Sequence, residues 1–107
     1  MSLDVYLMEV KQCDVFWSNI THNLGEMADH AGIYEALWEP EKIGARLAKD
    51  IIPILTVGLD VLKKNRGHFV KFNAKNNWGT YDDFVPWVEK YLEACKEHPD
   101  AEIRVSR

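Results

Sequence analysis

The sequence predicts an α+β domain in which an N-terminal hairpin and a C-terminal strand form a small antiparallel sheet covered by three to four helices. Apolar and polar residues alternate near both ends of the chain, which is typical of half-buried strands. Between the ends, apolar residues recur at the spacing of helix faces. The chain of 107 residues is about one domain long and contains no linker, so we expect a single domain over residues 1–107.

The strands are predicted from alternation and turn signals. Residues 3–8 alternate apolar and polar side chains, and residues 15–17 continue with residues that favour strands. A polar turn at 11–14 separates them, which predicts a hairpin. Residues 101–107 alternate in the same way after the turn signal at 99–100. We expect this last strand to pair with the first.

The first helix is predicted over residues 20–31. The apolar residues that define its buried face are Ile20, Leu24, Met27, Ala28 and Ala31. Gly32 then ends the helix, because glycine readily adopts the left-handed conformation of a C-terminal cap. After residues 33–38, Pro40 suits the first turn of a short second helix.

A third, longer helix follows. Asp50 is predicted to cap it, and Pro53 lies in the first turn, where a missing N–H costs little. The core face of this helix consists of Leu55, Leu59 and Leu62. Residues 65–67 end the helix, and residues 69–72 add one more turn.

The last helix has two alternative starts. Thr80 and Asp83 together resemble a capping box, but Pro86 would then lie inside the helix, so Asp83 is the alternative cap. Its buried stripe is predicted to contain Phe84, Trp87, Val88, Tyr91, Leu92 and Cys95.

The charge and composition exclude several classes of protein. A net charge of −4, with acidic and basic residues mixed, argues against duplex nucleic acid as a partner. The longest apolar run, 51–55, is far shorter than the roughly 20 residues of a membrane span. The start of the chain has no basic segment before an apolar one, so we expect a cytoplasmic protein. Cys13 and Cys95 are expected to be free thiols, and a free edge strand leaves a homodimer open.

The polar face of the first helix resembles a metal site. His22, Glu26, Asp29 and His30 recur at helical spacing, but they lie opposite the apolar face and are interpreted as the solvated side. We therefore predict no metal and no cofactor. The sequence also lacks the recognised hydrolase, phosphate-loop and dinucleotide motifs, so we assign no catalytic residue, with His22 as a general base the weaker alternative.

The candidate binding residues fall in two segments. The triplet Thr21-His22-Asn23 precedes a helix, whose first turn has unpaired N–H groups that suit an anion. Capping of this helix would explain the presence of Asn19 or Thr21, but it does not explain His22 and Asn23. The second segment is the loop around residues 73–81, which is rich in asparagine and aromatic residues. The residues predicted to contact a ligand are His22, Asn23, Trp38, Asn73, Asn77, Trp78 and Tyr81.

Several short segments resemble a family of small uncharacterised proteins encoded by bacteria and their phages. They are residues 2–7 (SLDVYL), 19–24 (NITHNL), 37–41 (LWEPE) with Gly44, 72–73 with 78–79 and Tyr81, and 99–102 (PDAE). The resemblance covers nearly the whole chain and implies a bacterial or phage cytoplasmic setting, without an activity. Members of that family carry proline after the asparagine at 73, where this chain has Ala74.

These observations favour a binding module over an enzyme. We expect a site for a small anionic or nucleotide-like ligand, with His22 and Asn23 on the polar part and Trp38, Trp78 and Tyr81 stacked on the flat part. The alternative is a protein-interaction module, for example an inhibitor of a host protein, that uses the same aromatic residues as anchors.

Overall fold

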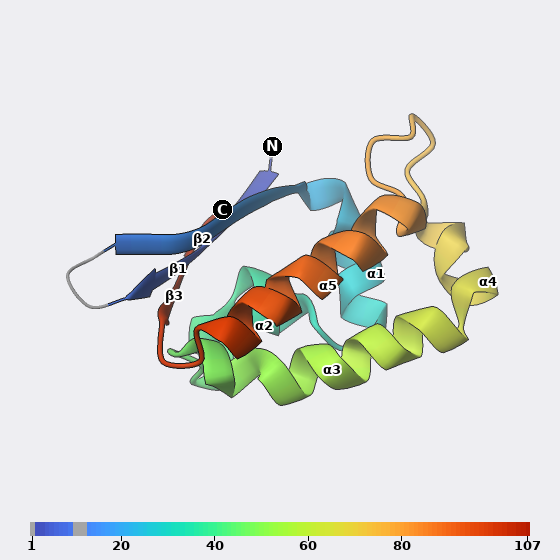
Figure 1. Cartoon of the computed structure of the whole chain (residues 1–107). Helices are drawn as coiled ribbons and strands as arrows, with labels where there is room; N and C mark the ends of the chain where they lie inside the picture. Colours follow the sequence, from blue (N-terminus) through green and yellow to red (C-terminus); the bar gives the residue numbers. More distant parts are fainter. Residues whose placement is uncertain (1, 10–12) are drawn as a thin grey trace.

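The computed structural model describes residues 2–9 and 13–107, with the backbone but not the side chain of Cys13. Three strands form one sheet, and the helices between β2 and β3 pack against it (Figure 1). This is the α+β architecture predicted from the sequence. No helix among the described residues combines the length and apolar character needed to cross a membrane.

The sheet has the order β2-β1-β3, and both pairings are antiparallel. Strand β1 (Ser2–Glu9) is central, with β2 (Cys13–Thr21) on one side and β3 (Glu102–Ser106) on the other. The predicted hairpin and the predicted partner of the last strand are therefore confirmed. Residues 11 and 12 of the predicted turn lie outside the described residues.

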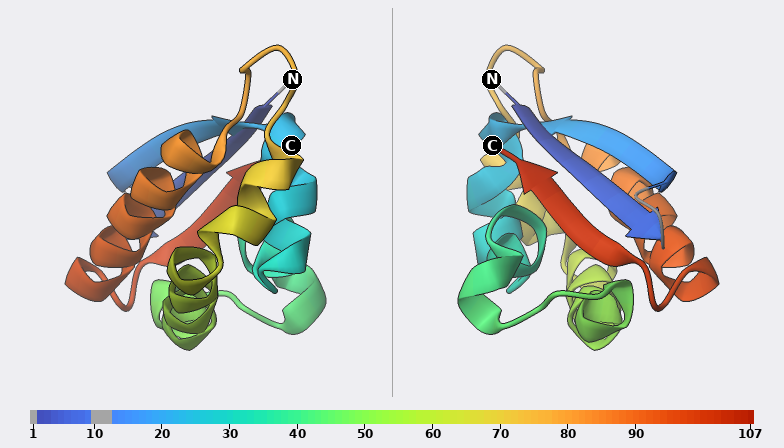
Figure 2. Two further views of the ribbon diagram at one scale, coloured as in Figure 1. Left: turned by 90° about the vertical axis from the view of Figure 1, so that its right-hand side faces the viewer. Right: turned by 90° about the vertical axis from the view of Figure 1, so that its left-hand side faces the viewer.

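The two faces of the sheet differ. The inward residues of β1, Leu3, Val5 and Leu7, are fully buried. Figure 2 shows the helices on this side of the sheet, while the other side is uncovered. On the uncovered face, Tyr6 lies opposite Trp17 of β2 and Arg104 of β3.

The first predicted helix starts too early. Strand β2 continues through Ile20, which pairs with Leu3, and only then do η1 (His22–Leu24) and α1 (Gly25–His30) follow. Ile20 is apolar because it faces the core from a strand, and its helical spacing to Leu24 is incidental. Gly32 has φ +79°, which confirms it as the residue that ends this helix.

An extra helix precedes the predicted short one. Residues 33–38, for which the sequence predicts no helix, contain α2 (Tyr34–Trp38), whose last three residues are buried. Pro40 is the first residue of η2 (Pro40–Ile43), as predicted. A helix as short as α2 has too few turns for a periodic pattern, and its formation depends on packing.

The long helix α3 (Ala48–Lys64) begins two residues before the predicted cap. Asp50 is its third residue rather than its cap. The Asp50 carboxylate accepts hydrogen bonds from the backbone N–H groups of Arg46 at 3.0 Å and Leu47 at 2.9 Å. These bonds hold the pKa of Asp50 below its ordinary value, the one from Leu47 most strongly.

After α3, the chain forms α4 (Arg66–Phe69) and η3 (Val70–Phe72), then a loop, and then α5 (Tyr81–Glu97). Thr80 caps α5 and accepts a hydrogen bond from the N–H of Asp83 at 3.3 Å. Pro86 therefore lies inside the helix, on its exposed side. Helices α3 and α5 lie side by side, and the buried residues of α5 include Phe84, Val88, Tyr91, Leu92 and Cys95.

Candidate ligand pocket

The two segments singled out in the sequence meet in the structure. The Asn23 side-chain amide donates a hydrogen bond to the backbone oxygen of Trp78 at 2.8 Å. Next to it, Gly79 has φ +112°, and a Cβ at this position would lie 2.9 Å from Cγ2 of Thr21. Glycine is needed here both for the backbone angle and for the close approach. The loop 73–80 is thereby fastened to the end of β2.

A pocket of about 370 Å³ opens at this junction. Its lining residues come from the end of β2, from η1, from the loop and from α5, and they are Asn19, Ile20, Thr21, Leu24, Asn77, Trp78, Gly79, Asp83 and Trp87. Ile20 and Leu24 are buried and give the pocket an apolar floor. Asparagine, threonine and aspartate side chains supply polar groups around it.

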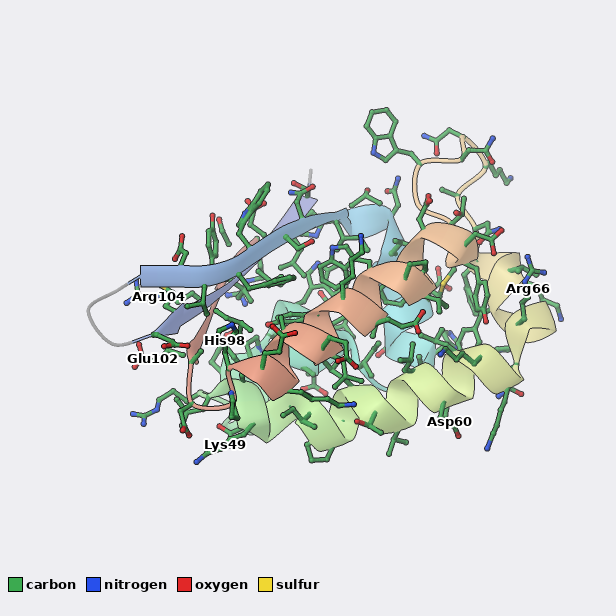
Figure 3. All side chains as sticks on the ribbon, in the orientation of Figure 1. Lys49, Asp60, Arg66, His98, Glu102 and Arg104 are labelled. Atoms are coloured by element: carbon green, nitrogen blue, oxygen red, sulfur yellow. The ribbon has the colours of Figure 1, made fainter. Side chains whose placement is uncertain are left out.

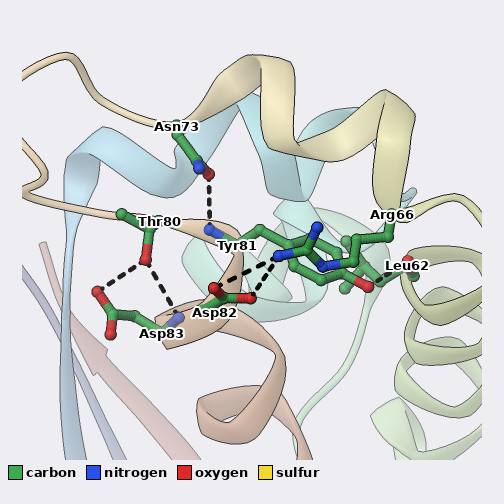
Figure 4. Close-up of polar contacts among 7 residues, drawn as sticks. All are labelled: Leu62, Arg66, Asn73, Thr80, Tyr81, Asp82 and Asp83. Carbon is green, nitrogen blue, oxygen red and sulfur yellow. Dashed lines mark hydrogen bonds and ion pairs between the residues drawn. The ribbon is translucent and has the colours of Figure 1, made fainter.

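The loop that forms one side of the pocket is held by its own hydrogen bonds. The side-chain oxygen of Asn73 accepts from the backbone N–H of Tyr81 at 2.7 Å, which closes the base of the loop (Figure 4). The side-chain oxygen of Asn76 accepts from the N–H of Trp78 at 3.0 Å. Asn77 has φ +61°, a conformation that asparagine tolerates better than most residues. The asparagines thus shape the loop that presents Trp78.

Two tryptophans line the pocket in different ways. Trp78 has 70% of its surface exposed, which is unusual for so large an apolar side chain. Trp87 is half-buried on α5, and its indole nitrogen Nε1 is buried with no hydrogen-bond partner among the described residues. A buried donor without an acceptor costs about 1–3 kcal/mol.

His22 and Trp38 lie together outside this pocket. The Trp38 indole donates a hydrogen bond to Nδ1 of His22 at 2.8 Å, so the neutral imidazole carries its proton on Nε2. Trp38 is buried, and its ring stacks on Tyr34 with 5.1 Å between the ring centroids. Arg107 also donates to the Trp38 backbone oxygen. These contacts connect η1, α2 and the C-terminus, and neither His22 nor Trp38 lines the pocket.

Tyr81 and Asn73 act at the base of the loop. The Tyr81 hydroxyl donates to the backbone oxygen of Leu62 at 2.7 Å, and the side chain is buried (Figure 4). The Arg66 guanidinium lies 5.4 Å from the Tyr81 ring centroid and pairs with Asp82 at 3.2 Å. Both Tyr81 and Asn73 join the loop to the ends of α3 and α5, and the Tyr81 ring does not line the pocket.

The pocket is polar without being cationic. Among the described residues, its lining includes Asp83 and no lysine, arginine or histidine. The nearby helix start offers few free donors, because the N–H groups of Tyr81 and Asp83 are already bonded to Asn73 and Thr80. In the same way, Thr21 accepts from the N–H of Asn23 at the start of η1. This arrangement suits uncharged hydrogen-bonding groups better than a phosphate.

Sequence reasoning misses the contribution of α5. The periodicity places Trp87 in the buried stripe, and it identifies Asp83 only as a helix cap. Both lie one or two turns into α5, on the side that faces β2 and the loop. The spacing of Asp83 and Trp87, four residues apart on one helix face, is the available signal.

The polar residues of the first predicted helix do not gather around a metal. His22 belongs to η1 and contacts Trp38, while Glu26, Asp29 and His30 lie on α1 and are exposed. Within residues 2–9 and 13–107, no three histidine, cysteine or acidic side chains lie close enough together to hold a metal ion.

Comparisons with protein-family models, with curated proteins and with solved structures find no match to this chain.

Proposed function

We propose that this protein is a binding module for a small nucleotide-like ligand, which occupies the pocket between β2, the loop 73–80 and α5. The observation that carries this proposal is the exposed Trp78 side chain at a pocket whose shape is held by Asn23 and Gly79. An exposed indole beside a concave polar surface is typical of a site that stacks on a flat ring.

The pocket fits the base and sugar of such a ligand better than its phosphate. Stacking of a base on an aromatic side chain contributes about 1–3 kcal/mol. Asn77 and Thr21 offer polar groups for a base edge or a hydroxyl. A phosphate finds no cationic side chain among the described lining residues and would extend into solvent.

Titration with nucleosides, followed by NMR, tests the proposal. We expect adenosine, guanosine, cytidine or uridine to shift the amide resonances of Asn77 and Gly79. Trp78→Ala should raise the Kd about tenfold or more. Trp17→Ala removes an exposed indole on another face and should leave the Kd unchanged.

The corresponding monophosphates provide the charge control. If the phosphate lies outside the pocket, AMP and adenosine should bind with similar Kd values. The proposal is wrong if none of the four nucleosides shifts these resonances, or if Trp78→Ala and Trp17→Ala have the same effect.

The uncovered face of the sheet favours protein binding as a second candidate function. Tyr6, Trp17 and Arg104 lie opposite one another across the three strands, and Trp17 is 57% exposed. Tryptophan, tyrosine and arginine are the residues most enriched in interface hot spots. If this second function holds, a host protein should co-purify with the wild type and with Trp78→Ala, but not with Trp17→Ala.

A further inference from the structure

The middle of the outer side of α3 is uncharged although it faces solvent. Between Asp50 and Asp60 the helix has no charged residue. Pro53, Thr56 and Val57 are nevertheless exposed, and Val57 has 65% of its surface accessible. A helix that is apolar on all sides is usually covered on all sides. This part of α3 therefore has the composition of a contact surface.

Opposite charges stand at the two ends of this surface. Lys49 and Asp60 are eleven residues apart, which is about three helical turns, so both lie on the same side as Pro53 and Thr56. Figure 3 shows Lys49 and Asp60 along the outer side of α3, turned away from the sheet. Their partners within the chain are exposed, Asp100 at 3.3 Å and Lys64 at 3.0 Å. Such surface pairs contribute little and exchange readily.

We propose that two copies of this chain associate through the outer stripe of α3, which consists of Lys49, Pro53, Thr56, Val57 and Asp60. The two helices pack antiparallel about a two-fold axis that passes between residues 54 and 55. Lys49 of each copy then lies beside Asp60 of the other, and the symmetry forms this ion pair twice. Pro53 of one copy faces Thr56 of the other. The charge pattern of the stripe is complementary to itself only in this antiparallel arrangement.

A groove beside the stripe can receive side chains of the second copy. It lies between α3 and α5, has a volume of about 570 Å³, and shares Thr56, Val57 and Asp60 with the stripe. Leu59 and Leu92 are nearly buried at its floor, and its rim carries both acidic and basic residues. One helix and one groove form a smaller contact than the roughly 800 Å² per partner of a standard interface, so the dimer should dissociate on dilution.

The association is tested by sedimentation over protein concentrations from about 1 µM to about 1 mM. We expect a reversible dimer. Lys49→Asp and Asp60→Lys each bring like charges together at both contacts and should raise the dimer Kd about tenfold or more. Val57→Asp places a charge on the apolar part of the stripe and should also weaken the dimer. Circular dichroism of each variant confirms that it is folded.

Mixing the two charge variants gives the decisive result. When Lys49→Asp pairs with Asp60→Lys, both contacts join opposite charges. One contact is the native pair of Lys49 with Asp60, and the other joins the two substituted side chains with the polarity reversed. Each variant homodimer instead has like charges at both contacts, so native mass spectrometry should show heterodimers in excess of either homodimer. Trp17→Ala is the control on the sheet face and should leave the dimer intact. The proposal is overturned if the wild type stays monomeric throughout, if the mixture shows no preference for heterodimers, or if Trp17→Ala abolishes the dimer.

Discussion

At the residue scale, two tyrosines of α5 show how the same side chain acquires different roles. Both Tyr81 and Tyr91 are buried. The Tyr81 hydroxyl donates to the Leu62 backbone oxygen at 2.7 Å, whereas the Tyr91 hydroxyl has no partner among the described residues. Burial raises the pKa of the Tyr91 phenol, because the charged form would be poorly solvated. Tyr91 therefore contributes through its ring, which stacks on Phe16 with 5.8 Å between centroids.

Replacing each tyrosine by phenylalanine should separate these roles. Tyr91→Phe removes a hydroxyl that makes no bond, so the free energy of unfolding should stay the same or rise by up to about 1 kcal/mol. Tyr81→Phe removes this buried hydrogen bond and leaves the Leu62 oxygen with only the longer bond from the Asn65 N–H at 3.4 Å, so it should lower the free energy of unfolding by about 1–2 kcal/mol. Urea denaturation of both variants measures the difference. A larger loss in Tyr91→Phe than in Tyr81→Phe would contradict this assignment.

At the element scale, hydrogen bonds made by side chains decide where helices and loops begin. Asp50 lies three residues into α3 and accepts from two N–H groups that precede the helix. Asn73 does the same for the first residue of α5 from across the loop. The sequence identifies Asp50 and Asn73 as residues that favour helix starts and turns, but not the N–H groups that each one reaches.

Asp50 should make stability depend on pH. Its pKa in the folded chain is below the ordinary value of 3.8, so its contribution is present above that value and is lost as the pH falls through the folded pKa. Asp50→Asn should therefore lower the free energy of unfolding at pH 7 by about 0.5–1 kcal/mol. Urea denaturation between pH 7 and pH 2 should show the gap to wild type closing in acid.

A surface aspartate serves as the control for that measurement. Asp60 pairs with Lys64 at 3.0 Å on the exposed side of the same helix. Asp60→Asn should change the free energy of unfolding of the monomer by no more than about 0.5 kcal/mol. If Asp50→Asn and wild type differ in free energy of unfolding by the same amount at all pH values, the Asp50 carboxylate is excluded as the cause of that difference.

The loop 73–80 depends on Gly79 for its position. Gly79→Ala combines a φ of +112° with a Cβ placed 2.9 Å from Thr21, so we expect a loss of about 2–3 kcal/mol in the free energy of unfolding. Gly44 has φ +71°, but a Cβ added there would meet nothing within 4 Å, so Gly44→Ala should cost about 1 kcal/mol. Thermal unfolding compares the two. Equal losses would show that the contact with Thr21 carries no energy.

At the scale of the whole molecule, the sheet and the helices share one apolar core. None of the described residues in this core is charged or polar by side-chain type, apart from the tyrosine hydroxyls and the indole groups. Cys95 lies within it on α5 and is fully buried, and burial raises its pKa to about 12. The thiol is therefore both covered and protonated while the chain is folded.

Cys95 should report on opening of the whole domain. Alkylation of Cys95 by iodoacetamide should require global unfolding, so its rate should rise with urea in parallel with the unfolding equilibrium. Mass mapping of peptides separates Cys95 from Cys13. The fully unfolded protein in urea gives the reference rate. A labelling rate that does not change at low urea would mean that α5 opens locally, against this prediction.

Much of the fold could be predicted because apolar residues recur with a regular period over long segments of the chain. The alternation in residues 3–8 and 101–107 predicted two strands and their pairing, and the stripe from Phe84 to Cys95 predicted α5. The boundary near Ile20 was wrong because one apolar residue fits both a strand and a helix pattern. Helix α2 was missed because five residues are too few to show a period.

The sequence by itself determined the α+β class, the pairing of the last strand with the first, and the presence of turns at Gly32 and Asn77, since each follows from local periodicity or local backbone preference. Tertiary structure alone decided that Asn23 reaches Trp78 while His22 turns to Trp38, that Trp87 borders the pocket, and that one side of α3 stays uncovered. The physical reason is that contacts between distant segments depend on how helices pack on the sheet, and packing is set by the shape of the whole core.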